Sequence, residues 1–257
     1  MKKLFVITSL FIVLYLPIYA GLPNTTEAVY DLEANTNDSY HDYDLTRDYC
    51  PEIDLYSNTR VFHGSYSYYP RKDGECSSCG QCLEKFWLRA PNSLITTLAN
   101  ASKWTICVYM YISDRDGVGR FNGDALLMVD DDGSDGGNNL NILVFTDTSG
   151  CGDNSVVMFR FGGYSCGGDY TPYYDSWARW NIEWDGSTYK LYINGTLKIS
   201  YSNSTNVFST ATDFKFGRDF FRGNYGWIDR IIIVRDVFNG GEIKAKGGPQ
   251  TNSAFEY

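Results

Sequence analysis

The chain has 257 residues, a formal charge of −9 and only two histidines. Such an acidic chain repels phosphate backbones, so its charge argues against nucleic-acid binding. Its 21 tyrosines, 15 phenylalanines, 6 tryptophans and 25 glycines are typical of a β protein with many turns, and a chain of this length can form one all-β domain.

The N-terminal twenty residues have the pattern of a secretory signal. A basic start at Met1-Lys2-Lys3 precedes an apolar run over 4–16, and the segment ends on the small residue Ala20. An uncleaved anchor is the alternative, but Pro17 shortens the run below the roughly 20 residues that a membrane span needs. We therefore expect removal of residues 1–20, a secreted or cell-surface location, and no stable membrane span afterwards.

Strand patterns recur along the chain, whereas helical periodicity is confined to 93–101 and 241–246. Strands are predicted at 104–111, 126–129, 140–145, 156–161, 177–184, 189–193, 197–201, 214–216 and 225–234. This order of elements predicts an all-β architecture.

The stretch 177–234 carries the strongest of these patterns. Trp180, Ile182 and Trp184 alternate with polar residues, as in a strand with one buried face. Gly186 supplies a turn, and Asn194-Gly195 is a strong signal for a type I′ hairpin. We predict an antiparallel meander over this stretch. The side chains expected between two packed sheets are Trp180, Trp184, Leu191, Ile193, Ile231 and Ile233.

Four motifs resemble one family in the same order. Residues 177–195 resemble the W-x-H-V-A-x-x-Y-D-G-S-x-x-x-L-Y-V-N-G run of laminin-G-like domains, which belong to the concanavalin A-like jelly rolls. Residues 216–231 resemble the family's I-G-R…G-x-I-D-E-V ending. Upstream, 32–39 is similar to L-D-G-N-A-N-D-S and 91–94 to V-P-N-S.

The resemblance implies a two-sheet antiparallel jelly-roll sandwich over 29–246. A linker at 21–28 and a tail at 247–257 flank it. The segment at about 50–82 departs from the family pattern and is interpreted as a Cys-rich insertion.

Seven cysteines suggest a disulfide framework. The spacing Cys76-x2-Cys79-x2-Cys82 mimics iron–sulfur ligands, but the signal directs the chain to an oxidising compartment, and the Cys-Pro pair comes first rather than last. Disulfides are therefore favoured over iron–sulfur or zinc. The six expected in disulfides are Cys50, Cys76, Cys79, Cys82, Cys151 and Cys166, with Cys151 and Cys166 the first candidate pair. Residues 104–111 resemble the family's F-T-I-S-A-W, where a small residue takes the place of Cys107, so we expect Cys107 to be buried and unpaired.

Five N-glycosylation sequons are present, and chance matches are the alternative in a chain rich in Asn, Ser and Thr. They begin at Asn24, Asn37, Asn100, Asn194 and Asn203.

A cluster of carboxylates follows the strand 126–129. Asp130, Asp132 and Asp135 could supply oxygen ligands to calcium, and the alternative is a solvated turn. Asp229 resembles the family's inward Asp before the last strand, and we expect it to hold backbone amides.

No catalytic constellation is found. Related jelly-roll glucanases carry E-x-D-x-E, and the run from Glu52 begins that pattern without a second glutamate. Neither histidine lies near a Gly-x-Ser-x-Gly elbow. We therefore predict no enzymatic activity, no organic cofactor, and an extracellular module that binds glycans. The alternatives are a structural or adhesive protein that contacts other extracellular proteins and, less favoured, a glycoside hydrolase.

Overall fold

A computed structural model describes residues 25–47, 56–58, 60–62, 64–68, 88–113, 124–130, 140–145, 156–161, 164–169, 175–218 and 225–243. Several predictions fall outside these residues. They concern the signal segment, most of the proposed Cys-rich insertion, and the side chains of Asn24, Cys50, Cys76, Cys79, Cys82, Asp132, Asp135 and Cys151.

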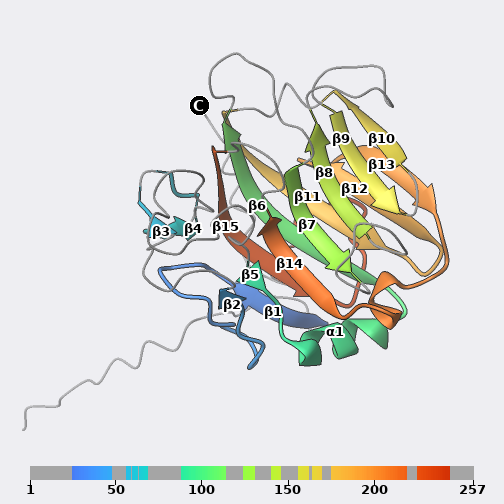
Figure 1. The fold of residues 1–257 in the computed structure, drawn as a ribbon, viewed down its shortest axis with the longest axis horizontal. Helices are drawn as coiled ribbons and strands as arrows, with labels where there is room; N and C mark the ends of the chain where they lie inside the picture. The colour runs from blue at the N-terminus through green and yellow to red at the C-terminus, as the bar shows by residue number, and fades with distance from the viewer. Residues whose placement is uncertain are drawn as a thin grey trace, which may run out of the picture.

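Two antiparallel sheets pack face to face in the described part of the chain (Figure 1). The first runs β13 (Thr196–Ser202), β12 (Thr188–Ile193), β11 (Trp177–Trp184), β6 (Trp104–Ser113), β15 (Tyr225–Val234), β4 (Ser67–Tyr68) and β3 (Tyr56–Ser57), with β1 (Thr26–Tyr30) also paired to β15. The second runs β10 (Tyr164–Asp169), β9 (Val156–Phe161), β8 (Leu140–Phe145), β7 (Asp124–Asp130), β14 (Asp213–Arg218), β5 (Leu88–Arg89) and β2 (Thr46–Arg47). The predicted all-β sandwich is confirmed.

The core lies between the two sheets. All six side chains predicted to be buried there are at most 5% exposed. Phe214 and Phe216 enter the same core from the second sheet. Tyr68, within the segment interpreted as an insertion, is fully buried in this core, so β4 belongs to the sandwich itself.

A short helix closes one end of the sandwich. The predicted helix at 93–101 is present as α1 (Asn92–Ala99), which packs against the 3-10 turn η2 (Val207–Ser209). In the part of the chain that the structure describes, no helix is long and apolar enough to cross a lipid bilayer. The second predicted helix, at 241–246, is wrong for its described residues. Residues 241–243 are not helical, because the Gly240 and Gly241 carbonyls accept hydrogen bonds from β11 side chains.

The predicted meander holds for three strands only. β11, β12 and β13 are consecutive neighbours, and Asn194 and Gly195 have the positive φ angles, 49° and 81°, of a type I′ turn. The next strand, β14, lies in the opposite sheet, and β15 returns to the first sheet beside β6. A period-two pattern sets which side chains face the core but not which strand is the partner, and both sheets bury their apolar faces in the same core.

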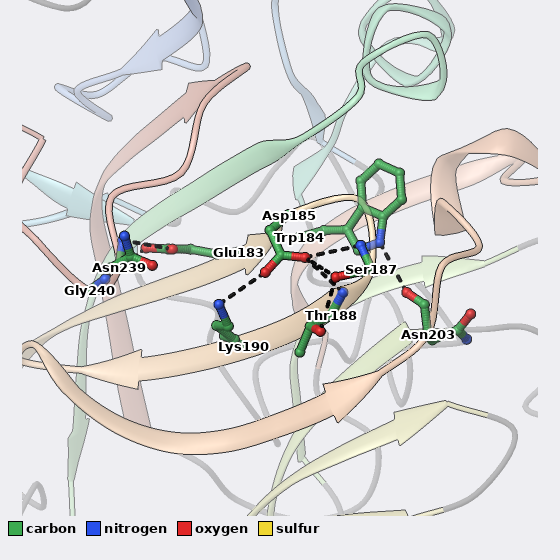
Figure 2. A network of polar contacts seen from close by, with 9 residues as sticks. All are labelled: Glu183, Trp184, Asp185, Ser187, Thr188, Lys190, Asn203, Asn239 and Gly240. Atoms are coloured by element: carbon green, nitrogen blue, oxygen red, sulfur yellow. Dashed lines mark hydrogen bonds and ion pairs between the residues drawn. The ribbon is translucent and has the colours of Figure 1, made fainter.

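Asp185 organises the turn between β11 and β12. One carboxylate oxygen accepts hydrogen bonds from the backbone amides of Ser187 (3.0 Å) and Thr188 (2.9 Å), and the other lies 3.0 Å from Lys190 Nζ (Figure 2). Burial alone would raise the pKa of Asp185. The hydrogen bonds from Lys190, Ser187 and Thr188 outweigh burial and lower this pKa to about 2.

This lowered pKa predicts an acid-sensitive contribution to stability. An unfolded aspartate titrates near pH ~3.9, so the stabilisation by Asp185 is fully present above that pH and is lost as the pH falls toward about 2. We expect Asp185→Asn, which keeps the turn but removes the charge, to lose less thermal stability than the wild type between these pH values. Melting curves across this range measure the difference, with the exposed Asp42→Asn as control. If the melting temperatures of the wild type and Asp185→Asn fall by the same amount over this pH range, the lowered pKa of Asp185 is contradicted.

Candidate functional site

The outer face of the first sheet, turned away from the second sheet, is covered over part of its area by segment 235–243. The Glu183 carboxylate accepts hydrogen bonds from the backbone amides of Asn239 and Gly240, both at 2.9 Å (Figure 2). Arg179 donates to the Gly240 carbonyl at 2.9 Å, and Asn181 donates to the Gly241 carbonyl at 2.8 Å.

These contacts correct the prediction that β11 has one buried face. Asn181 and Glu183 alternate with the core residues as predicted, yet each is only 1% exposed. Buried polar groups are stable when they are hydrogen-bonded, and here the backbone of 239–241 supplies their partners. Only glycine fits at Gly240, where φ is 75° and an added Cβ would lie 2.5 Å from the Tyr192 ring.

A small second apolar cluster lies under this covering segment. It contains Val29, Cys107, Ile232, Val234 and Ile243. Cys107 is buried there as a free thiol, and burial raises its pKa to about 12. The thiol therefore stays protonated at neutral pH, which is the inert state expected from the sequence.

The remaining part of the outer face carries an aromatic row. Trp177 of β11 and Trp227 of β15 both lie directly opposite Tyr111 of β6 in the strand pairings. Their ring centroids lie 5.8 Å and 5.4 Å from that of Tyr111, with interplanar angles of 66° and 83°. These three residues, Trp177, Tyr111 and Trp227, form an aromatic row across three adjacent strands. The pairing register of β11 and β15 with β6 places them side by side.

The segment 60–62 packs beside this row. Phe62 stacks on Tyr109 with ring centroids 4.3 Å apart and lies 5.8 Å from the Trp177 ring. The Phe62 amide donates to Asp229 at 2.7 Å, and Asp229 is fully buried. The prediction that Asp229 holds a backbone amide is confirmed, and this bond fixes the loop against the sheet.

Two charged groups lie at the margin of the aromatic row. The Arg60 guanidinium carbon is 4.3 Å from the centroid of the Tyr111 ring and 5.5 Å from that of the Trp227 ring, a cation–π arrangement. The Tyr111 hydroxyl donates to Asp175 at 3.3 Å. Burial, with Asp175 adding to it and Arg60 opposing it, raises the pKa of Tyr111, so the phenol stays neutral.

Chemically, this arrangement combines flat apolar rings with one cation and one carboxylate. Tyr111 and Trp227 are buried, at 4% and 9% exposed. Trp177, Tyr109 and Phe62 are half-buried, and Arg60 and Asp175 are exposed. Aromatic faces can pack against apolar C–H surfaces of a ligand, and exposed charged groups can donate to or accept from its polar groups.

The predicted calcium residues are placed only in part. Asp130, at the end of β7, is 1% exposed, and its backbone carbonyl accepts from the Thr212 amide at 2.8 Å. Its neighbour across the strand pair is Asp213, which forms ion pairs with Arg89 and Lys215. Among the described residues, no three acidic, histidine or cysteine side chains gather as metal ligands. A calcium site at 130–135 stays a prediction.

The four described sequon asparagines lie on different parts of the fold. Asn37, Asn100 and Asn194 are exposed, and Asn203 is half-buried. Asn194 Oδ1 accepts from the Arg179 amide at 2.8 Å, so its side chain also stabilises the hairpin. Cys166 lies in β10, opposite Met158 of β9. Glycosylation and disulfide pairing stay predictions.

The aromatic row was missed from the sequence, although a signal for part of it was present. Tyr109, Tyr111 and Trp177 stand at outward positions of strands whose inward positions are already apolar or aromatic. Strands that are apolar on both faces indicate a sheet with a partner on each side. Arg60 follows no periodic pattern, and no sequence signal identifies it.

Comparison with known proteins supports the fold. No family model and no curated protein matches the sequence. Among solved structures, domain 4 of a GH43 extracellular arabinanase from Geobacillus stearothermophilus, in complex with arabinotriose, matches with a TM-score of 0.54 at 16% identity, covering 82% of this chain and 92% of that domain.

Toxin structures match similarly over part of their length. Botulinum neurotoxin type C, whose uptake into cells depends on two ganglioside molecules, has a TM-score of 0.56 at 13% identity, covering 84% of this chain and 49% of that chain. The binding domain of botulinum neurotoxin DC in complex with rat synaptotagmin II has a TM-score of 0.53 at 10% identity, covering 84% and 49%. This chain therefore spans about half the length of these toxin chains. At such identities the likeness shows the β-sandwich fold alone.

Proposed function

We propose that the protein is a secreted, non-catalytic carbohydrate-binding module and that its glycan site is the aromatic row with Arg60 and Asp175. The observation that carries the proposal is the direct register of Trp177, Tyr111 and Trp227 across three strands. Trp177, the half-buried member of the row, gives a sugar ring an apolar face to pack against, while the exposed groups Arg60 and Asp175 bond sugar hydroxyls.

The comparisons support this class of function. The arabinanase domain that shares the fold was solved with arabinotriose bound, and the toxin structures concern gangliosides and rat synaptotagmin II. Within the jelly rolls, the motifs at 177–195 and 216–231 favour the laminin-G-like group. An extracellular setting, with disulfides, N-glycans and calcium at the acidic loop, completes the proposal.

The proposal is tested by removing one ring of the row. We expect the secreted wild-type chain to bind members of a glycan array, and Trp177→Ala to weaken that binding by about tenfold or more, since one aromatic contact contributes about 0.5–1.5 kcal/mol beyond its buried area. Leu197→Ala is the matched control, because Leu197 is a 50% exposed apolar side chain on β13, two strands away from β11. Titration calorimetry gives the affinities.

A protein partner is the alternative that the same variants distinguish. If the wild type binds no glycan on the array, or if Trp177→Ala and Leu197→Ala bind as the wild type does, the glycan site is not the aromatic row. Binding to a purified extracellular protein that depends on Trp177, with no glycan binding, would favour an adhesive role.

A further inference from the structure

Arg60 differs in its partners from most of the other cations of the described chain. Six other cations form ion pairs with acidic side chains, namely Arg89, Lys103, Lys190, Lys215, Arg230 and Arg235. Arg179 donates to the backbone carbonyl of Gly240. The Arg60 guanidinium instead lies over the rings of Tyr111 and Trp227, and no carboxylate of the described residues forms an ion pair with it. Arg60 is also exposed. This is notable in a chain of net charge −9, where acidic partners are abundant.

The contacts around Arg60 hold it in a defined place. The two rings lie within 5.5 Å of its guanidinium carbon, and its own backbone carbonyl accepts a hydrogen bond from the Ser67 hydroxyl. Phe62, two residues on, is fixed by Asp229. An arginine positioned in this way loses little side-chain entropy when it binds a ligand, which favours affinity.

We infer that Arg60 receives the carboxylate of an acidic sugar unit, so that the site selects glycans in which such a unit adjoins a neutral one. This inference rests on the proposed glycan site. A guanidinium is planar, and its fork of N–H donors matches the two oxygens of a carboxylate. The guanidinium carbon lies over both rings, and the N–H donors of a guanidinium lie in its own plane, where a ligand carboxylate can meet them.

Asp175 restricts the same site to one acidic unit. Its carboxylate accepts from the Tyr111 hydroxyl, whereas Arg60 lies over the face of the Tyr111 ring. A carboxylate near Asp175 would be repelled, while a neutral sugar can donate its hydroxyls there. The site therefore fits a glycan with an isolated acidic unit better than a polymer of uronic acids.

The test compares a ligand with its neutralised copy. Sialyllactose and its methyl ester have nearly the same shape but differ in the charge of the carboxylate, and calorimetry with the full secreted chain measures both. We expect the wild type to bind the acid about tenfold more tightly than the ester, and raised salt to reduce this ratio. Arg60→Gln should abolish the preference, and Arg60→Lys should retain only part of it, because the charge remains but the fork is lost.

Other outcomes separate this inference from the proposed function. Trp177-dependent glycan binding with equal affinity for acid and ester would overturn the role of Arg60 and leave the glycan site standing. A preference for the acid that persists in Arg60→Gln would also overturn it, provided that the melting temperature shows the variant to be folded. Equal binding of 3′-sulfolactose would show that the site accepts any anion and overturn the carboxylate assignment. No binding of any glycan would remove both proposals.

Discussion

Replacing Trp184 with alanine is expected to lower the free energy of unfolding by about 3–5 kcal/mol, the range for truncating a buried aromatic side chain. Trp184 is 5% exposed, and its ring packs beside those of Trp104 and Tyr189, with centroids 6.3 Å and 6.1 Å away. Its Nε1–H also donates to the Asn203 carbonyl at 3.1 Å (Figure 2). The substitution would leave a cavity between aromatic side chains and remove the donor to that carbonyl.

Trp177→Ala is the control for this experiment. Trp177 begins the same strand, but it lies on the outer face and is half-buried. We therefore expect its truncation to lower the free energy of unfolding clearly less than that of Trp184. Urea unfolding of both variants measures the two costs. An unchanged midpoint for Trp184→Ala, or a larger loss for Trp177→Ala, would mean that the assignment of inner and outer faces is wrong.

The sequence predicts the local geometry of the strands well, because that information lies within a few residues. Alternation in 177–184 identifies Trp180 and Trp184 as core residues, and the pair Asn194-Gly195 identifies a two-residue turn. Both signals depend only on which way neighbouring side chains point and which residues tolerate positive φ. The bounds of β11 and β15 match their predictions for the same reason.

Pairing between distant segments could not be predicted in the same way. Glu183 stands at a polar position that predicts contact with solvent, yet its partners are the amides of Asn239 and Gly240, about 56 residues later in the chain. Likewise, 214–216 has the pattern of a strand but no feature that assigns it to the opposite sheet. Such choices depend on how the whole core is filled rather than on local sequence.

In the candidate site, too, local structure could be predicted from the sequence but contacts between distant segments could not. Tyr111 and Trp177 can be assigned to strands from the sequence, but their register, which places them opposite each other, follows from the β6–β11 pairing. Arg60 lies two residues before Phe62, which Asp229, far along the chain, anchors to the sheet. The chemistry of the site thus comes from residues whose proximity no spacing in the sequence indicates.

Asn206 is the polar residue on which the closed end of the sandwich depends, and it is 8% exposed. Its Oδ1 accepts from Trp104 Nε1 and from the Phe208 amide, both at 3.2 Å. Its Nδ2 donates to carbonyls near the end of α1. These belong to Leu98 (2.8 Å), Ala99 (3.2 Å) and Ala101 (3.3 Å). One side chain therefore joins α1, η2 and β6, and its amide group is suited to this because it both donates and accepts.

Asn206→Asp is expected to cost about 3–5 kcal/mol at neutral pH, as for other uncompensated buried charges. The two side chains have the same shape, but an ionised carboxylate cannot donate, so it would face three carbonyl oxygens. Burial and these carbonyls would raise the pKa of the introduced carboxyl above the ~3.9 of the unfolded chain. The cost should therefore be smallest below about pH 4, where the carboxyl is neutral in both states, and should grow as the pH rises.

Asn100→Asp provides the matched control. Asn100 follows α1 directly, and its Nδ2 donates to the Thr96 carbonyl at 2.9 Å, but its side chain is exposed. The same substitution there should cost clearly less, because water can solvate the new charge and the helix dipole disfavours an anion at this end by only about 0.3–1 kcal/mol. Urea unfolding of both variants at several pH values measures the difference. A cost for Asn206→Asp that matches that of Asn100→Asp, or that does not grow as the pH rises, would show that the hydrogen bonds of Asn206 do not hold this end of the sandwich together.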